Sequence, residues 1–338
     1  MPKNNKKRPV PLAPPALKSR KKARKVTSLF HKLTQQMDRA KTKNDAEGIQ
    51  RISEEIDDMG GREEYQRASQ LSTKFHSTSR WVIKVMGSKG WTNGLPIDED
   101  DCEDSQDSPE VRKEPEVKER RAVQILEVGA INTELVDAAR RTKRIRKKKE
   151  HTSKGSDEDG VPSSQQYQNI PMFNISVRAI DLRSTFADIE EKDFLQMPVQ
   201  NEKKGTYDVI VCSMVLNCVT TPEQRGEMLS LLYKQLRPGG LCFFTIPRLC
   251  INQSKFIDRK LFEELLTDAL GFVIDSQKET PKVAFWILKR PKDAAKKMVK
   301  WNKKWESTPI IHRAQKFRNL FCVSLKKNEA YVRNQKLL

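Results

Sequence analysis

The chain has 338 residues, of which 64 are Lys or Arg and 45 are Asp or Glu, so its formal net charge is +19. This excess of positive charge indicates a polyanionic partner, with nucleic acid favoured over an anionic membrane. Apolar residues make up 36% and charged residues 32% of the chain, a composition that is lean for one compact globule. There is no run of about 18 apolar residues and no apolar leader, so the sequence predicts neither a membrane span nor a secretory signal.

The N-terminal part combines a charged arm with helical periodicity. Residues 1–25 hold ten Lys or Arg, five prolines and no acid, which predicts a disordered basic arm. Its cluster Lys18–Lys25 suits nuclear import and phosphate contact equally, and a merely solubilising tail is the alternative. Residues 26–80 are predicted to form a helical extension, because apolar residues recur at helical spacing over Leu29–Met37 and Ile49–Met59. Such an extension serves either as a cap or substrate-docking platform, or only as a packing extension with no role in substrate binding.

Three further segments have biased composition. Residues 97–119 contain eleven Asp or Glu and are predicted to be an acidic linker without a metal site. Residues 142–166 begin with a Lys/Arg run and continue rich in Ser, Gly and Asp, which predicts a mobile surface insert. Residues 326–338 form a basic tail. The six cysteines show no paired metal spacing and are expected to be buried, reduced thiols.

Residues 120–325 alternate apolar strand patterns with amphipathic helices. Such alternation predicts an α/β domain with a largely parallel sheet and helices on both faces. The expected strands begin with Leu126–Val128 and continue with Ile175–Ile180, Tyr207–Met214, Leu241–Ile246, Phe272–Ser276 and Val283–Leu288, and Asn319–Leu325 is a candidate for a further one. The expected helices are Pro222–Gln235 and Asp258–Ala269.

Two residues follow the first two strands at positions where a nucleotide ligand needs them. Gly129 permits the tight turn and the close approach of a ligand after the first strand. It stands alone, without the fuller glycine set of a dinucleotide site, and an ordinary turn glycine is the alternative. Asp181 ends the second strand, where a carboxylate accepts ribose hydroxyls, and a turn cap is the alternative. The 52 residues between them exceed the usual spacing of about 20, and the 142–166 insert accounts for the excess.

Two more positions extend this candidate site. Asp193 is placed to accept the amino group of an adenine ring, with Phe194 packing near that ring; a surface Asp beside a core Phe is equally expected. Further along, the strand over residues 207–214 delivers Ser213 and Met214 to the carboxyl edge of the sheet, where ligands of open α/β folds bind.

The order of these segments resembles the class I S-adenosylmethionine-dependent methyltransferases, and three of them resemble the fungal 25S ribosomal-RNA adenine-N1 methyltransferase family. The resemblance rests on Ile180–Ser184 with Ile189–Leu195, on Cys212–Val219 with Arg225–Leu229, and on Met59–Gly61 with Tyr65–Ser69, and Arg318–Val323 partly matches the family's last strand. It implies a Rossmann-like sheet, S-adenosylmethionine as cofactor, and cofactor contacts at Gly129 and Asp181.

The resemblance also implies a function. Adenine N1 carries a lone pair at neutral pH, so methyl transfer to it requires positioning and no general base. No catalytic residue is therefore assigned, and the four histidines are expected to be surface or structural residues. The expected partners are ribosomal RNA and the pre-60S particle, and the expected location is the nucleus and nucleolus. Trp301 and Trp305 are expected either to stack on bases or to pack in the core. A non-enzymatic S-adenosylmethionine-binding sensor is the alternative function, which the basic segments disfavour.

Overall fold

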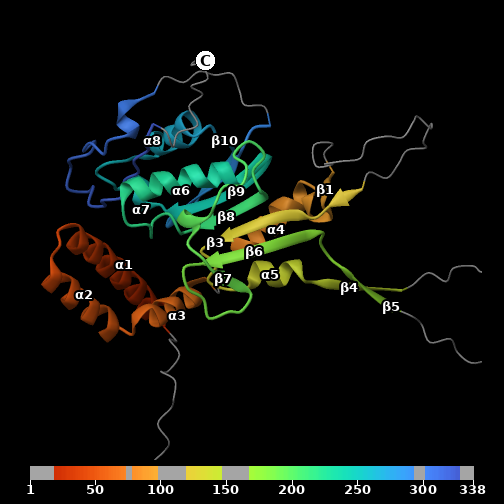
Figure 1. Cartoon of the computed structure of the whole chain (residues 1–338), viewed down its shortest axis with the longest axis horizontal. Coiled ribbons are helices and arrows are strands. Elements are labelled where there is room, and N and C mark those ends of the chain that lie inside the picture. The colour runs from red at the N-terminus through yellow and green to blue at the C-terminus, as the bar shows by residue number, and fades with distance from the viewer. Residues whose placement is uncertain (1–18, 74–77, 98–118, 147–166, 293–300, 328–338) are drawn as a thin grey trace, which may run out of the picture. The chain divides into compact units, whose positions relative to one another are not determined.

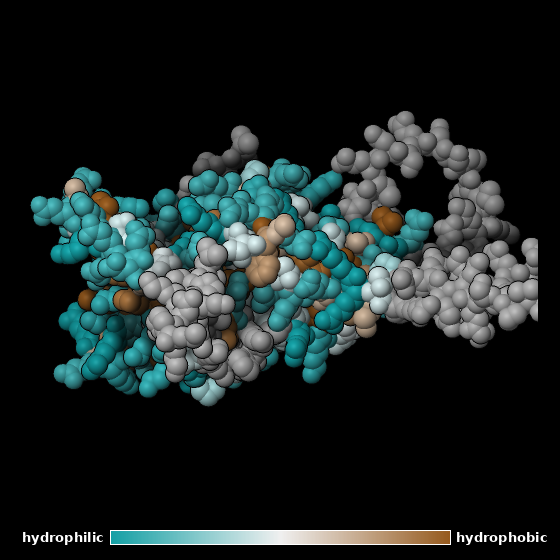
Figure 2. Space-filling model, turned by 90° about the horizontal axis from the view of Figure 1, so that it is seen from below, coloured by the Kyte–Doolittle hydropathy of each residue, from teal (hydrophilic) through white to brown (hydrophobic). Residues whose placement is uncertain are grey.

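The computed structural model describes residues 19–73, 78–97, 119–146, 167–292 and 301–327. They divide into two compact units, residues 1–77 and residues 78–338. Most of the predicted basic arm, acidic linker, insert and basic tail lies outside the described residues. On the face drawn in Figure 2, hydrophilic residues predominate and hydrophobic residues occur as separate spots. No helix in the described ranges is long and apolar enough to cross a membrane.

The first unit consists of three helices, α1 (Arg20–Thr42), α2 (Ala46–Asp58) and α3 (Gly61–Thr73). The first helix begins at Arg20, inside the predicted arm, because the Ser19 hydroxyl caps it by accepting from the Lys22 amide. Both predicted apolar stripes are used: Leu33, Ala40 and Ile52 form a small core between α1 and α2. Leu29 stays 43% exposed, so the first stripe is narrower than its spacing predicts.

The second unit is built on a seven-stranded sheet with the order β10-β11-β9-β8-β3-β6-β7 (Figure 1). Its strands are β3 (Val123–Val128), β6 (Ile175–Asp181), β7 (Ile189–Glu191), β8 (Tyr207–Ser213), β9 (Leu236–Pro247), β10 (Val273–Glu279) and β11 (Val283–Lys289). The first five are parallel, and β11 and β10 add antiparallel at one edge. The sheet order runs outward in both directions from β3, which is the doubly wound arrangement and confirms the predicted Rossmann-like class.

Helices cover both faces of the sheet because alternate strand residues point to opposite sides. On one face, Leu126, Ile210 and Phe244 pack against α6 (Pro222–Gln235) and α8 (Arg259–Glu264). On the other face, Ile125 and Phe243 pack with α4 (Thr78–Ser88) and α5 (Glu134–Ala139). The remaining helix of this unit, α7 (Leu249–Asn252), follows β9.

Several expected elements differ from the structure. The predicted helix 258–269 is α8 followed by a π-helical turn over Leu265–Ala269. The strand predicted over Leu241–Ile246 is β9, and it starts earlier, at Leu236. Leu236 already pairs with Tyr207 of β8, before a register shift between the two strands. Residues 319–325 are not a sheet strand; their single strand-like contact is a bridge between Ser254 and Asn319.

The C-terminal segment 321–325 is held instead by side chains and a close backbone approach. The buried Arg225 guanidinium donates to the carbonyl oxygens of Val219, Thr220 and Cys322. A Cβ at Gly226 would lie 1.9 Å from the Ser324 carbonyl oxygen, so only glycine lets the segment pass so near α6. The segment therefore belongs to the core without joining the sheet.

Two short antiparallel strand pairs flank the acidic linker and the 142–166 insert. β1 (Leu95–Pro96) pairs with β2 (Arg120–Arg121) across the acidic linker. β4 (Thr142–Arg146) pairs with β5 (Tyr167–Pro171), so the start of the insert is a strand and not the predicted loop. This hairpin brings the two ends of the insert together, as the spacing between Gly129 and Asp181 requires.

One buried ion pair fixes the start of β8 against β2 and β3. The Asp208 carboxylate accepts from both terminal nitrogens of Arg121, at 2.6 and 2.7 Å, and from the Gln124 amide at 2.8 Å. Its side chain is 4% exposed and that of Arg121 is 20% exposed, so removing the carboxylate leaves a poorly solvated cation. We expect Asp208→Ala to lower the free energy of unfolding by about 2–4 kcal/mol. Urea unfolding measures this, and a loss below about 0.5 kcal/mol would contradict it.

Candidate cofactor site at the carboxyl edge of the sheet

The centre of the sheet presents three strand ends side by side. Val128, the last residue of β3, pairs with Ile180 of β6 on one side and with Cys212 of β8 on the other. The first and fourth strands in chain order thus meet at the point where the strand order reverses. Ligands of open α/β sheets bind at this point, outside the carboxyl ends of the strands.

Gly129 turns the chain sharply at the end of β3. Its φ is +71°, in the left-handed region, and a Cβ there would lie 2.4 Å from Val215 Cγ2. Its amide and that of Ala130 both donate to the Ile180 carbonyl oxygen, at 2.8 and 2.9 Å. The position therefore requires glycine both for conformation and for close approach.

Asp181 ends β6 beside this turn. Because Val128 is level with Ile180, the next residues of the two strands, Gly129 and Asp181, emerge at the same edge. The structure thus brings the two principal predicted residues together despite the long gap in sequence. One carboxylate oxygen of Asp181 also accepts from the Arg183 amide at 3.0 Å, the turn contact that was the alternative for this residue.

Asp193 and Phe194 follow β7, and their contacts match the alternative interpretation, a surface Asp beside a core Phe. The Asp193 carboxylate accepts from the Leu195 amide at 2.9 Å and caps a short helical turn. The Phe194 side chain is 3% exposed and belongs to the core on the α6 face. Contact of this pair with an adenine ring stays a prediction.

Glu127 is a residue of the site that the sequence reasoning missed. It lies on β3, two residues before Gly129, and its Oε2 atom is buried with no hydrogen-bond partner among the described residues. Burial, and secondarily the negative charge of Glu134, raises the pKa of Glu127 to about 8. The signal in the sequence was an acidic residue two positions before the turn glycine. A buried oxygen without a hydrogen-bond partner is typical of a functional position.

The end of β8 supplies a hydroxyl chain and a strained residue. Ser213 Oγ lies 2.9 Å from both Thr78 Oγ1 and Thr245 Oγ1. Met214 follows with φ +61°, a conformation that costs a non-glycine residue energy and clusters at functional sites. Asn217, three residues on, has a buried Oδ1 atom without a partner within the described ranges. The predicted delivery of Ser213 and Met214 to this edge is observed.

Neither acid–base catalysis nor metal binding is indicated by the side chains at this edge. Of the two histidines in the described residues, His31 packs against Tyr65 in the first unit, and His312 lies 3.7 Å from Asp258. Across the described part of the chain, no group of three or more His, Cys, Asp or Glu is placed to hold a metal ion. The turn at Gly129 and the Asp181 carboxylate suit the binding and orientation of a ligand.

The residues present fit S-adenosylmethionine. Asp181 offers a carboxylate for ribose hydroxyls, and the exposed side chains of Leu182 and Met214 offer apolar surface to a nucleoside. The orphaned oxygen of Glu127 suits a ligand that carries positive charge on its sulfonium and amino groups.

We expect Asp181→Ala to weaken S-adenosylmethionine binding by about 1–3 kcal/mol, through lost charge-assisted hydrogen bonds to ribose. Because the Asp181 carboxylate also supports the Arg183 turn, Asp181→Asn is the matched variant, which keeps an oxygen for that turn. Calorimetric titration gives both affinities. Unchanged affinity in both variants would remove Asp181 from the site.

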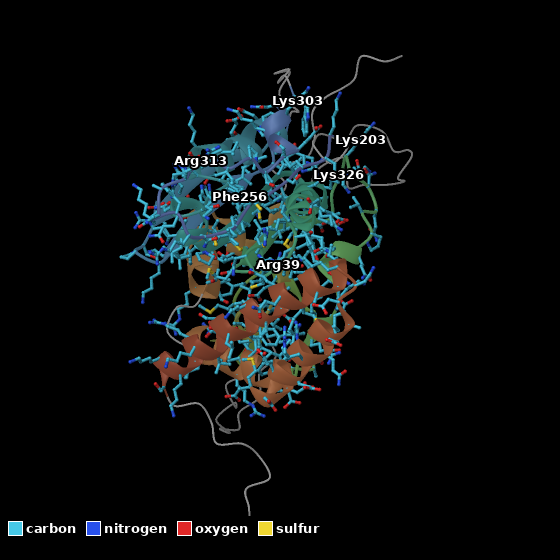
Figure 3. All side chains as sticks on the ribbon, turned by 90° about the vertical axis from the view of Figure 1, so that its left-hand side faces the viewer. Arg39, Lys203, Phe256, Lys303, Arg313 and Lys326 are labelled. Atoms are coloured by element: carbon cyan, nitrogen blue, oxygen red, sulfur yellow. The ribbon has the colours of Figure 1, made fainter. Side chains whose placement is uncertain are left out.

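The exposed surface of the second unit carries basic side chains outside this edge. Lys203, Lys303, Arg313 and Lys326 are exposed and are labelled in Figure 3. Trp305 is 1% exposed and donates to Glu264, so it packs in the core and is not a base-stacking platform. Trp301 stacks edge-on against it, with ring centroids 5.0 Å apart.

Comparison with known proteins identifies relatives. The model of the family described as 25S rRNA (adenine(2142)-N(1))-methyltransferase, Bmt2, matches residues 50–155 and 135–323. The 25S rRNA (adenine(2142)-N(1))-methyltransferase of Saccharomyces cerevisiae is 29% identical over 127 residues, which are 38% of this chain and 37% of that protein. The match thus spans well under half of the yeast protein.

Solved structures with similar chains have low identity. The N-methyltransferase NodS from Bradyrhizobium japonicum WM9, in complex with S-adenosylhomocysteine, is 15% identical with a TM-score of 0.31, over 51% of this chain and 80% of NodS. A mutant form of the 16S rRNA (adenine(1408)-N(1))-methyltransferase from Catenulisporales acidiphilia is 13% identical with a TM-score of 0.27, over 51% of this chain and 88% of that one.

The family match covers the first unit from residue 50 in α2 onward, the sheet, and the C-terminal segment as far as residue 323. It includes Gly129, Asp181 and the strand end at Ser213, whose geometry is described above. It confirms the resemblance predicted from the sequence. The chain belongs to the family of 25S rRNA (adenine(2142)-N(1))-methyltransferases.

Proposed function

We propose that this chain transfers a methyl group from S-adenosylmethionine to N1 of an adenine in large-subunit ribosomal RNA. The observation that carries the proposal is the family match over the strand edge that bears Gly129 and Asp181, with the orphaned Oε2 atom of Glu127 two residues before Gly129. When bound, the cofactor supplies an electrophilic methyl group on a positively charged sulfur.

The arrangement suits this reaction because the reaction needs no proton transfer. The N1 lone pair forms the new N–C bond as the C–S bond breaks, and the positive charge passes from sulfur to the adenine ring. The side chains have to hold the two reactants in line and tolerate a cation. The Asp181 carboxylate at the edge favours positive charge, and the orphaned Oε2 atom of Glu127 is available to accept from a cationic donor.

RNA as the substrate is supported by charge. A net charge of +19 attracts a polyanion, and N1 of a paired adenine is hidden, so the target base has to be unpaired or flipped out. A sensor that only binds the cofactor has no need of this charge, which disfavours that alternative. We further propose association with the pre-60S particle in the nucleolus, for which Lys18–Lys25 is the proposed import signal.

The test is methyl transfer to large-subunit RNA by the purified chain, with N1-methyladenosine identified by nucleoside analysis after digestion. We expect N1-methyladenosine at one adenine with the wild-type chain and none with Gly129→Arg. Cofactor binding without any methylated nucleoside would support the sensor instead. A methyl group on the exocyclic N6 atom would contradict the proposed target atom.

A further inference from the structure

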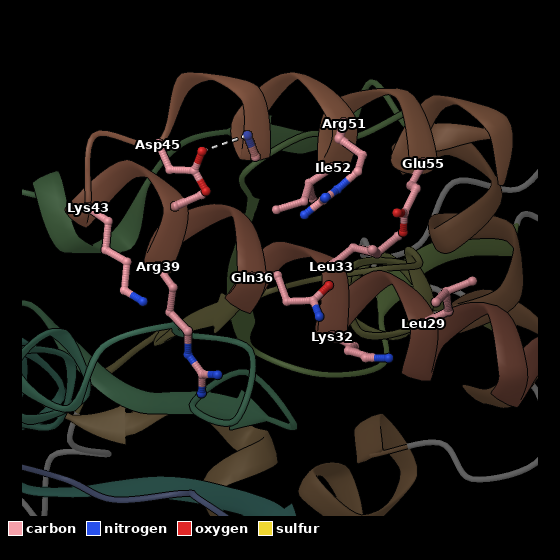
Figure 4. Close-up of a pocket in the computed structure, with 12 residues that line it drawn as sticks. Leu29, Lys32, Leu33, Gln36, Arg39, Lys43, Asp45, Arg51, Ile52 and Glu55 are labelled. Atoms are coloured by element: carbon pink, nitrogen blue, oxygen red, sulfur yellow. Dashed lines mark hydrogen bonds between the residues drawn. The ribbon is translucent and has the colours of Figure 1, made fainter.

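A basic groove lies between α1 and α2 in the first unit. It is an open pocket of about 410 Å³. Its floor is made of buried Leu33, Ala40, Gly48 and Ile52, which come from both helices. Figure 4 shows the side chains of Lys32, Arg39 and Lys43 projecting from α1 and its C-terminal end, and that of Arg51 from α2. These four cations are called the groove cations below.

The groove cations are spaced to act together. Lys32, Arg39 and Lys43 are separated by seven and four residues, so they follow one side of the helix. All four groove cations are exposed. None of the four forms an ion pair within the described residues, whereas Arg67 on α3 pairs with Glu63 and Glu64.

The two carboxylates at the rim offset only part of this charge, because four cations face two anions. Asp45 is occupied as the cap of α2, because one of its oxygens accepts from the Gly48 amide at 2.9 Å. Glu55 lines the other end of the groove and, in the part of the chain that the structure describes, forms no ion pair with Arg51. Like charges four residues apart on a helix repel, so Arg39 and Lys43 oppose folding slightly until an anion lies between them.

The helix α1, which forms one wall of the groove, is predominantly basic. α1 carries eight Lys or Arg and a single acidic residue, Asp38. Lys and Arg side chains bind phosphate oxygens by charge-assisted hydrogen bonds, and the Gln36 amide in the groove adds a neutral donor. The apolar floor between the cations suits the sugar and base that accompany each phosphate.

We propose that the α1–α2 groove binds the phosphate backbone of the RNA substrate. RNA is favoured over an acidic peptide because positive charge continues along α1 beyond the groove, as a long polyanion requires, whereas a short peptide needs only the groove itself. The proposal rests on the proposed function for the identity of the RNA. It assigns to the first unit the task of holding RNA, while the carboxyl edge of the sheet holds the cofactor.

The test compares two triple variants of the full chain with equal loss of charge. The groove triple is Lys32→Gln, Arg39→Gln and Lys43→Gln. The control triple is Lys203→Gln, Lys303→Gln and Arg313→Gln, which neutralises three exposed cations of the second unit that do not line the groove. Affinity for a large-subunit RNA fragment is measured by fluorescence anisotropy over a range of salt concentrations.

We expect the groove triple to bind RNA about 10–100-fold more weakly and to reduce the slope of log K against log salt by about 2, since each lost phosphate contact removes about 0.7–0.9. The control triple should weaken binding by less than about 3-fold. A charge-conserving triple, Lys32→Arg, Arg39→Lys and Lys43→Arg, should retain most of the affinity. Affinity for S-adenosylmethionine should be unchanged in all three.

Equal weakening by the groove and control triples would overturn the proposal, because it would mean that only diffuse charge attracts RNA. Unchanged RNA binding by the groove triple would also overturn it. Loss of binding to polyglutamate with RNA binding intact would assign the groove to an acidic peptide. These outcomes are separate from the methylation assay: a wild-type chain that methylates no adenine contradicts the proposed function, whichever triple binds RNA.

Discussion

Replacing Gly129 with arginine is expected to abolish S-adenosylmethionine binding while the chain remains folded. The φ of +71° costs a non-glycine residue about 1–2 kcal/mol, and the new Cβ displaces Val215, 2.4 Å from its Cγ2. The long cationic side chain then lies at the edge where the cationic cofactor would bind. Together these effects should lower the affinity by more than about 100-fold, which corresponds to about 2.7 kcal/mol.

Gly90 provides the matched control for this change. Its φ of +73° imposes the same backbone strain, but a Cβ there would meet nothing within 4 Å. Gly90→Arg should therefore lose about 1 kcal/mol of stability and bind the cofactor normally. Calorimetric titration, with circular dichroism to verify folding, measures both variants. A folded Gly129→Arg chain with wild-type affinity would show that the first strand does not lead into the cofactor site.

The second large effect is a dependence of stability on pH that comes from Glu127. Its pKa is about 8 in the folded chain and about 4.5 when unfolded. Between these values the unfolded chain has lost the proton that the folded chain still holds, so stability falls as pH rises through this window. Below pH 4.5 both states are protonated and the effect vanishes. We expect a loss of about 5 kcal/mol between pH 4.5 and 8.

Glu127→Gln isolates this contribution because glutamine resembles the protonated acid and does not titrate. The variant should match the wild type near pH 4 and exceed its unfolding free energy by about 5 kcal/mol above pH 8. Urea unfolding at a series of pH values measures the difference. Glu134→Gln, which removes the smaller cause, should shift the window slightly toward lower pH. Parallel stability curves for Glu127→Gln and wild type would show that Glu127 is ionised in the folded chain.

The sheet could be predicted because its strands are continuous apolar runs. Strands such as β8, buried on almost every residue, and the helix α6, with Thr221 as its cap and Pro222 at its start, carry strong local signals. The segment 319–325 was misjudged for the same reason. Its apolar residues are buried, but against Arg225 and Gly226 of α6, and local periodicity does not reveal which partner an apolar run will find.

The candidate site was predictable in part. Gly129 and Asp181 follow from the need for a turn and a carboxylate at strand ends, and both lie at the expected edge. Glu127 was missed because an acid inside an apolar strand carries no local signal of burial. The core position of Trp305 depends on Glu264, 41 residues earlier, and no pattern in the sequence links the two.

The packing of the C-terminal segment over α6 also constrains the order in which the chain can mature during translation. A nascent chain that has reached residue 318 contains all seven strands of the main sheet and the whole of α6. Its Arg225 guanidinium still lacks the Cys322 carbonyl, and the surface beside Gly226 that Ser324 covers is still open to water. The sheet unit therefore acquires its final core only after residue 325 has been added.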